Sequence, residues 1–206
     1  MEQKGLMLGG ITGRALSSVL RYLVFTALMS LTAAVVGYMR SNGDFGSIAV
    51  MIQGVEDLAV SLRSKPLIEQ WLSVFAHNMR VIVILIGVSW VPVVPVMAVA
   101  LMNSIMLGAM LKATAVATGI PPITVLVGLL PHGIFELSAF FIGAAMCLRI
   151  GMLLPLWLSK SVDNSHMRRA AYDLMILFFA IIVPLMLAAS LIEVTFSAWL
   201  AEVLAR

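Results

Sequence analysis

The chain has 206 residues, of which 62% are hydrophobic and 11% charged, and its mean hydropathy is +1.07. A soluble domain carries about a quarter charged and about half apolar residues, so this composition predicts an all-α, polytopic membrane protein in contact with the lipid bilayer. The formal net charge is +3, but the basic residues are scattered and no polar domain holds them, which argues against a nucleic-acid partner.

The N-terminal segment 1–21 contains several glycines and basic residues, and we expect it to be a loose start to the chain. The charge-free run Tyr22–Met39 is long enough to cross a bilayer once. The segment 40–75 is polar, its charges balance, and its apolar residues recur at helical spacing on both sides of Ser64-Lys65-Pro66. We expect two amphipathic helices there, lying on the membrane surface or capping the bundle.

The apolar run that follows is longer than one crossing. Trp90, Pro92 and Pro95 mark the expected turn, which gives one crossing over 76–91 and another over 96–118. A short helix is expected over 122–130, too short to span the bilayer and ended by Pro131. We interpret it either as a re-entrant segment or as one side of a plain kink.

A further crossing is expected over 134–157, then a basic loop over 158–171 and a last crossing over 172–195 that extends toward Leu204. The chain is thus predicted to form one membrane domain over 1–206, with five crossings. The two net-positive stretches, 1–21 and 158–171, fall on one side, which the positive-inside rule makes cytoplasmic. We therefore expect the cytoplasmic membrane as the location, with segment 40–75 outside.

The stretch Leu130–Leu137 places polar groups and helix breakers inside an apolar run, namely Pro131, His132, Gly133 and Glu136. Such groups are costly in hydrocarbon and are often functional there. In the predicted topology Lys112, His132, Glu136 and Glu193 all lie in the outer half of the membrane, so we expect a shared polar pocket with Lys112 as a counter-charge. The alternative is an ion-pair lock that only holds helices together.

Three other polar side chains lie in or near the crossings. Arg149 is alone in the inner half and is expected to reach the interface or to bond backbone carbonyls. Asn78 and Asn103 are amides at or inside crossings, and we expect Asn103 to bond across helices. Four small residues repeat every four positions, Ala139, Gly143, Cys147 and Gly151, which predicts a close helix contact.

The chemistry-bearing residues do not form a recognisable catalytic set. His132 and Glu136 share a helix face at i, i+4 and could contribute to a metal site, but two ligands are an incomplete set. The sequence lacks a His-Glu-x-x-His motif, a Gly-x-Ser-x-Gly motif and a phosphate-binding glycine loop. We therefore expect no enzyme activity, no metal and no cofactor.

The residues around this stretch resemble a known family. Leu130-Pro131-His132-Gly133-Ile134-Phe135-Glu136-Leu137-Ser138-Ala139, with Gly143 and Gly151 after it, is similar to the signature of the stage II sporulation protein M family. Weaker similarities are Asn78-Met79-Arg80-Val81, Asn103 followed by Gly108, and Ala189–Thr195 with Glu193. The departures are His77, Ser104 and Met146, which stand where the family usually has asparagine, glycine and glycine.

The resemblance covers about residues 75–195 and implies a polytopic membrane protein without established catalytic activity. In endospore formers the family's founding member anchors peptidoglycan-remodelling partners during engulfment, and transport has been suspected for relatives that do not sporulate. Two hypotheses follow. The chain is a membrane scaffold that recruits envelope proteins, with a homo-oligomer left open, or it is a carrier of a small solute or ion whose site is the Pro131–Glu136 break.

Overall fold

The computed structural model describes residues 2–41, 65–91 and 93–197, with only the backbone of residues 2–9 and Ser197. Every regular element in these residues is a helix. Five helical segments are long and apolar enough to cross a membrane: Gly10–Arg40, Leu67–Val88, Val94–Thr118, Pro122–Leu158 and Asn164–Phe196. The predicted all-α, five-crossing architecture is therefore confirmed.

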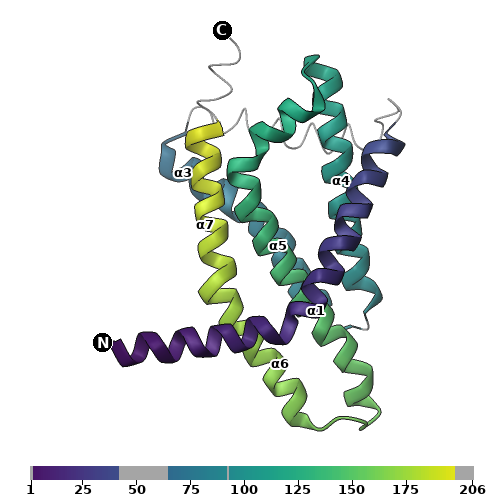
Figure 1. Ribbon diagram of the computed structural model, residues 1–206, viewed down its shortest axis with the longest axis vertical. Helices are drawn as coiled ribbons and strands as arrows, with labels where there is room; N and C mark the ends of the chain where they lie inside the picture. Colours follow the sequence, from purple (N-terminus) through teal and green to yellow (C-terminus); the bar gives the residue numbers. More distant parts are fainter. Residues whose placement is uncertain (1, 42–64, 92, 198–206) are drawn as a thin grey trace.

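Helix α1 extends over Glu2–Arg40 and includes the segment that we expected to be loose. The expectation was wrong because packing outweighs the low helix propensity of glycine. Ala15 and Val19, in the first half of α1, are fully buried against the bundle. Figure 1 shows that this half lies across one end of the bundle, and that α1 then bends and runs along the other helices.

Helix α3 covers Leu67–Val88 and helix α4 covers Val94–Thr118. Residues 67–75 are thus the first turns of a long helix and not a separate surface helix, which corrects the expectation for that part of 40–75. The other amphipathic helix falls mostly on residues outside the described ranges. The turn between α3 and α4 lies where Trp90 and Pro95 predicted it, and α4 ends at Gly119, whose φ of 68° suits a glycine C-cap.

Helix α5 is continuous over Pro122–Leu158, with Pro131 and Pro155 inside it. The predicted separation into a short helix over 122–130 and a crossing from 134 is therefore wrong, whereas the alternative of a plain kink at Pro131 agrees with the continuous helix. A proline inside a helix removes one hydrogen bond and bends the axis without ending the helix when both sides are held by packing. The ribbon of α5 bends between its first turns and its long lower part (Figure 1).

The last crossing is a chain of helical pieces: α6 (Asn164–Leu177), the π-helical turn η1 (Phe178–Ile182), α7 (Val183–Ile192) and the π-helical turn η2 (Glu193–Ser197). It begins eight residues before the predicted 172, so the expected loop over 158–171 is mostly helix. The early start has a local cause, since the Asp163 side chain accepts hydrogen bonds from the backbone N–H groups of Ser165 and His166. Pro184 cannot donate to the turn before it, and η1 lies there.

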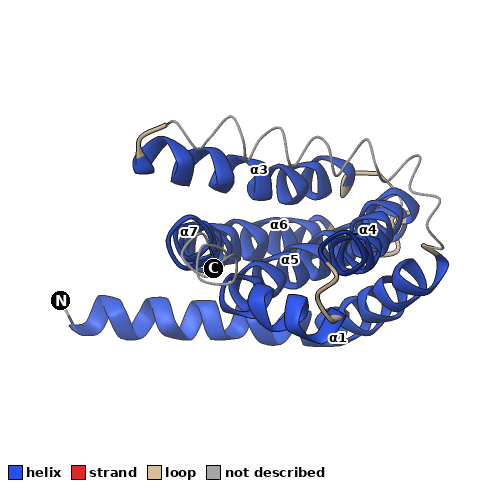
Figure 2. Cartoon of the chain, turned by 90° about the horizontal axis from the view of Figure 1, so that it is seen from above, coloured by secondary structure: helices blue, strands red, loops and turns tan. Residues whose placement is uncertain are grey.

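Helix α5 is the centre of the bundle. Of its most apolar window 67% is buried, against 22–28% in the other four segments. Viewed along the bundle, α3 and α1 flank a middle row that contains α7, α6, α5 and α4 (Figure 2). The predicted small-residue face of α5 is buried, and a Cβ at Gly143 would lie 3.1 Å from the Ile82 side chain of α3. The outer faces of the helices carry large apolar side chains that suit contact with lipid.

Helices α1 and α4 cross at very short range. A Cβ at Gly37 would clash with the backbone of Ile105, and a Cβ at Gly108 would clash with the backbone of Ala34. Both glycines are buried. The two glycines therefore permit a backbone contact of the kind that small residues provide between membrane helices.

Candidate functional site: two polar clusters on helix α5

Four of the predicted site residues meet in what we call the His132 cluster: Asn78, His132, Glu136 and Glu193. One ligand atom from each of His132, Glu136 and Glu193 lies within 4.8 Å of the others. The Asn78 amide nitrogen lies 3.5 Å from a Glu193 carboxylate oxygen. His132 is buried at 8% exposure, and the two glutamates are partly buried.

The local structure explains why these residues meet. His132 and Glu136 are four residues apart on α5, so they lie on one face of the helix. Asn78 comes from α3, and Glu193 is the first residue of the π-helical turn η2. A π-turn widens the helix and shifts the direction of its side chains, and such turns are frequent at functional sites. Pro131 and Gly133 flank His132 at the start of the long part of α5.

Two predicted members lie elsewhere. The Lys112 ammonium is 5.7 Å from the ring centroid of Tyr38, in a cation–π arrangement between α4 and α1. Lys112 makes no ion pair with Glu136 or Glu193, since the ion pairs of the described residues are Arg149–Asp173 and Asp163–His166. Asn103 makes no side-chain hydrogen bond to another described residue. The expectations of a Lys112 counter-charge and of an Asn103 bond across helices are therefore wrong. The sequence indicated how deep each residue lies in the membrane, but it did not specify which helix faces would meet.

The His132 cluster has groups that suit the binding of a cation, besides its contacts between helices of the bundle. Two carboxylates at short range in apolar surroundings repel each other when both are ionised, and no Lys or Arg side chain of the described residues pairs with them. A proton or a metal ion would relieve this repulsion. Imidazole nitrogen and carboxylate oxygen are donors that Zn²⁺ accepts, so the donor set fits a divalent metal better than the sequence indicated.

A second polar cluster lies toward the other end of α5, and we did not predict it from the sequence. The Arg149 guanidinium donates to an Asp173 carboxylate oxygen at 2.8 Å and to the Ser18 hydroxyl at 2.7 Å. The Ser18 hydroxyl lies 3.4 Å from the same carboxylate oxygen. We call these three residues, from α5, α6 and α1, the Arg149 cluster. Arg149 is thus paired with side chains, and the expectation that it reaches the interface or bonds backbone carbonyls is wrong.

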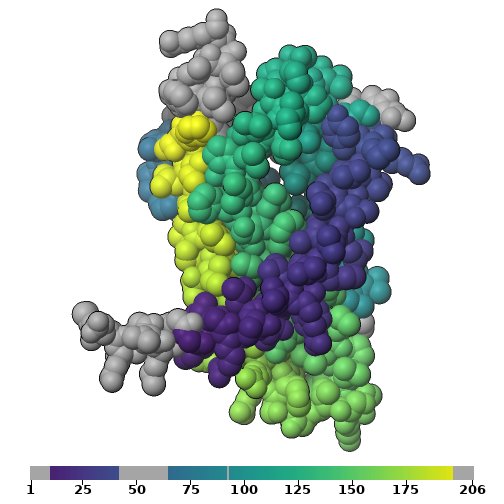
Figure 3. Space-filling view, in the orientation of Figure 1, coloured from purple at the N-terminus to yellow at the C-terminus, as the bar shows by residue number. Residues whose placement is uncertain are grey.

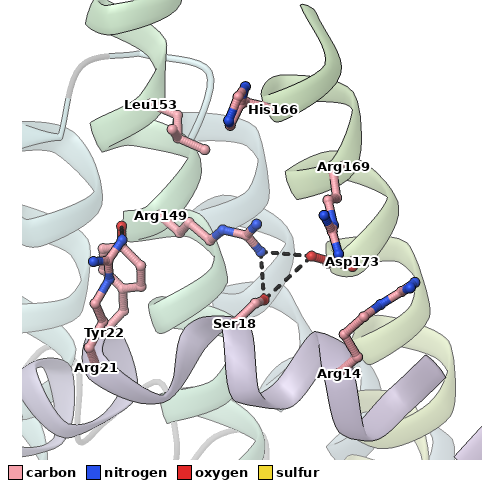
Figure 4. Close-up of a pocket in the computed structure, with 9 residues that line it drawn as sticks. All are labelled: Arg14, Ser18, Arg21, Tyr22, Arg149, Leu153, His166, Arg169 and Asp173. Atoms are coloured by element: carbon pink, nitrogen blue, oxygen red, sulfur yellow. Dashed lines mark hydrogen bonds and ion pairs between the residues drawn. The ribbon is translucent and has the colours of Figure 1, made fainter. Parts of the chain in front are cut away.

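The Arg149 cluster is largely withdrawn from water. The side chains of Arg149 and Asp173 are 13% and 2% exposed. The other Asp173 carboxylate oxygen is buried and has no hydrogen-bond partner among the described residues, which leaves the charge-assisted bonds on a single oxygen. One side of the cluster opens into a cavity of about 250 Å³ (Figure 4).

Comparison with known proteins identifies the family. The family model described as "Stage II sporulation protein M" matches residues 21–198. The chain belongs to this family. No curated protein and no solved structure matches the chain.

In this stage II sporulation protein M family member, three separate stretches that resembled the family contribute to one site. Three stretches meet in the His132 cluster: Asn78 in the middle of α3, the Pro-His-Gly-x-x-Glu stretch of α5, and Glu193 near the end of the last crossing. Asn103 and Lys112 lie outside it.

A signal for the Arg149 cluster was present in the sequence. Arg149 precedes Ser161 by twelve residues and Asp173 follows it by twelve. Residues at equal distances from the turn of a helical hairpin lie at equal height, so the pair could have been found by folding the chain about that turn. Ser18 could not, because the contact depends on where α1 crosses the bundle.

Proposed function

We propose that this protein is a non-enzymatic scaffold of the cytoplasmic membrane that anchors partner proteins. The observation that carries the proposal is that the polar side chains inside the apolar bundle bind one another across helices at two levels. The Arg149 cluster joins α1, α5 and α6, and the His132 cluster joins α3, α5 and η2. Contacts of this kind hold the helices in a fixed arrangement, which a docking platform requires.

The two levels are separated along α5 by nearly the thickness of a bilayer core. His132 and Arg149 are 17 residues apart on α5, which is about 25 Å at the rise of an α-helix, against a hydrocarbon core of about 30 Å. Charged groups near a boundary cost less than groups at the centre. With this spacing the two clusters fit near opposite boundaries of the bilayer core, and on our proposal they fasten the bundle there at a low electrostatic cost.

The charge distribution supports an orientation with the N-terminus in the cytoplasm. The first half of α1 and the turn between α5 and α6 lie at the same end of the bundle (Figure 1). Arg14 and Arg21 belong to this half of α1, Lys160 to the turn, and Arg168 and Arg169 to the first turns of α6 that follow it. Basic residues concentrate on the cytoplasmic side of membrane proteins.

The proposed partners are envelope proteins that remodel peptidoglycan, as the family resemblance implies, and a second copy of the chain is a further candidate. Affinity purification of the tagged full-length protein from cross-linked native membranes tests the proposal. We expect a peptidoglycan-active protein in the eluate, and we expect His132→Ala and Glu136→Gln to reduce both its recovery and the melting temperature of the scaffold. Each lost polar contact between membrane helices costs about 1 kcal/mol.

Variants that melt like the parent protein and yet lose partner recovery or function would contradict the role of the cluster as a fastening. Glu69→Gln is the matched control, because Glu69 is an exposed carboxylate in the first turn of α3. An eluate without any peptidoglycan-active protein would contradict the proposed class of partner.

A carrier of a proton or metal ion is the second candidate function. It is favoured by the short distances among His132, Glu136 and Glu193, which match a cation site. Purified protein in liposomes would be assayed for proton and Zn²⁺ flux, with Glu136→Gln as the test variant and Glu69→Gln as the control. Flux that depends on Glu136 would favour the carrier over the scaffold, and flux equal to that of empty liposomes would remove it.

A further inference from the structure

The cavity beside the Arg149 cluster has a strong excess of positive charge. Four arginines line it, Arg14, Arg21, Arg149 and Arg169, against the single carboxylate of Asp173. With His166 neutral, the lining has a formal charge of +3. The only ion pair among these residues is Arg149–Asp173, so three guanidinium groups are left without an acidic partner among the described residues.

The three arginines line the cavity from two helices. Arg14 and Arg21 come from the part of α1 that lies across the bundle, and Arg169 comes from α6 (Figure 4). All three are exposed, whereas Arg149 between them is fixed by Asp173 and Ser18. Arg21 is oriented by its own neighbour, since it donates to the Tyr22 hydroxyl at 2.9 Å and lies over the Tyr22 ring.

The size of the cavity narrows the choice of ligand. Clefts for drug-sized ligands have volumes of roughly 300–1,000 Å³, and this cavity of about 250 Å³ is slightly smaller. It suits a compact anionic group and not a large organic ligand. Guanidinium groups bind phosphate through paired hydrogen bonds, and basic pockets between membrane helices bind lipid head groups.

The position of the cavity also fits a membrane ligand. Leu153 of α5 forms an apolar part of the lining, and the space-filling view shows α1 crossing in front of α5 and α6 at this end of the bundle (Figure 3). A head group held by the arginines would leave its acyl chains beside the apolar faces of the helices. From this arrangement we infer that the cavity is a binding site for a phosphate-bearing anionic group, with Arg14, Arg21 and Arg169 as its ligands and Arg149 as the fixed base of the site.

The chemistry is shared by two sources, an anionic phospholipid and a soluble phosphate compound. The protein would be reconstituted in nanodiscs of phosphatidylcholine alone or with phosphatidylglycerol, and its melting temperature and retained lipids would be measured. In a second arm, inorganic phosphate and glycerol phosphate would be titrated into the phosphatidylcholine sample. Stabilisation in the first arm identifies a lipid ligand, stabilisation in the second a soluble one, and either supports the site.

Variants separate the site from the general positive charge of this end. Arg14→Ala and Arg169→Ala should each weaken the apparent affinity for the stabilising probe about tenfold, the value of one charge-assisted bond. Arg168→Ala is the matched control, because Arg168 is an exposed neighbour on α6 that does not line the cavity. If the alanine variant is unstable, Arg169→Lys takes its place. Lysine keeps the charge but cannot form the paired hydrogen bonds of a guanidinium, so this variant should weaken binding while leaving the fold intact.

Two results would overturn the inference. One is that neither phosphatidylglycerol nor the soluble phosphates stabilise the parent protein. The other is that Arg168→Ala weakens binding as much as Arg169→Ala, because the effect would then depend on surface charge and not on the cavity.

Discussion

Arg149 shows how one residue can fasten three helices inside an apolar bundle. A buried ion pair contributes little net stability compared with apolar side chains of the same shape, but removing one partner leaves the other charge buried and unpaired. Asp173 is the more deeply buried partner and accepts both bonds on one oxygen. The pair is therefore more important for the position of α1 and α6 than for the free energy of unfolding.

We expect Arg149→Met and Asp173→Leu each to lower the stability in detergent by about 3–5 kcal/mol. The double variant should recover most of this loss, because no unpaired charge is left in it. Thermal unfolding of the four proteins would give the coupling energy. If the stability losses of the two single variants simply add up in the double variant, the two side chains do not interact. Arg168→Met is the control for the loss of a basic residue at this end of the bundle.

The His132 cluster illustrates the limit of prediction at the residue scale. The sequence predicted a common depth for His132, Glu136 and Glu193 from their places along the apolar runs. The structure brings the three side chains together. The sequence did not predict that Lys112 lies outside the cluster. The direction of its side chain depends on how α4 is rotated against α1, and in the structure its ammonium contacts the ring of Tyr38 on α1. Depth is encoded locally in the sequence, whereas rotation about a helix axis depends on packing.

At the scale of elements, the cap of α6 makes a prediction about pH. Hydrogen bonds from the Ser165 side chain and from His166 lower the pKa of Asp163 from its ordinary value of 3.8 to about 2. A lowered folded-state pKa means that the cap contributes fully above the unfolded value and is lost as the pH falls through about 2. An NMR titration of the Ser165 and His166 amides should therefore have its midpoint near 2.

The variant Asp163→Asn provides the control for this titration. Asparagine is a good N-cap, so α6 should start at the same residue while the pH dependence disappears. A midpoint at 3.8 in the parent protein would show that the carboxylate does not accept these hydrogen bonds in solution.

The crossing of α1 and α4 makes a steric prediction. Gly108→Ala should destabilise the protein by about 1–3 kcal/mol, because its Cβ has no space beside the Ala34 backbone and the helices must separate. The control is Gly87→Ala in α3, where a Cβ meets nothing within 4 Å. That variant should be neutral or more stable by about 0.5–1 kcal/mol. Equal melting temperatures for the two variants would contradict the close crossing.

The elements that the sequence predicted well are those with local causes. Apolar length set the number of crossings, and Pro95 and Gly119 set the ends of α4. The errors concern helix continuity: α1 begins early in spite of its glycines, α3 begins at Leu67, and α5 continues through Pro131. In each case a polar or helix-breaking residue was taken as a boundary, although packing on neighbouring helices was able to hold the helix together.

At the scale of the whole molecule, the two clusters and the basic residues give the bundle distinct ends. The first half of α1 and the turn after α5 lie at one end (Figure 1), with the basic residues Arg14, Arg21 and Lys160, whereas His132 lies 17 residues before Arg149 on α5. The proposed scaffold and the proposed phosphate site would both use this polarity. The orientation of the chain in the membrane is therefore the property that connects them.

Cysteine labelling would measure this orientation. The native Cys147 is fully buried, so it should react poorly with a membrane-impermeant maleimide. Thr118→Cys and Ser161→Cys place exposed thiols at opposite ends of the bundle. If the basic end faces the cytoplasm, intact cells or spheroplasts should label Thr118→Cys, whereas Ser161→Cys should react only after lysis. The reverse pattern would invert the topology and place the arginine-lined cavity on the outer face, away from the cytoplasmic leaflet.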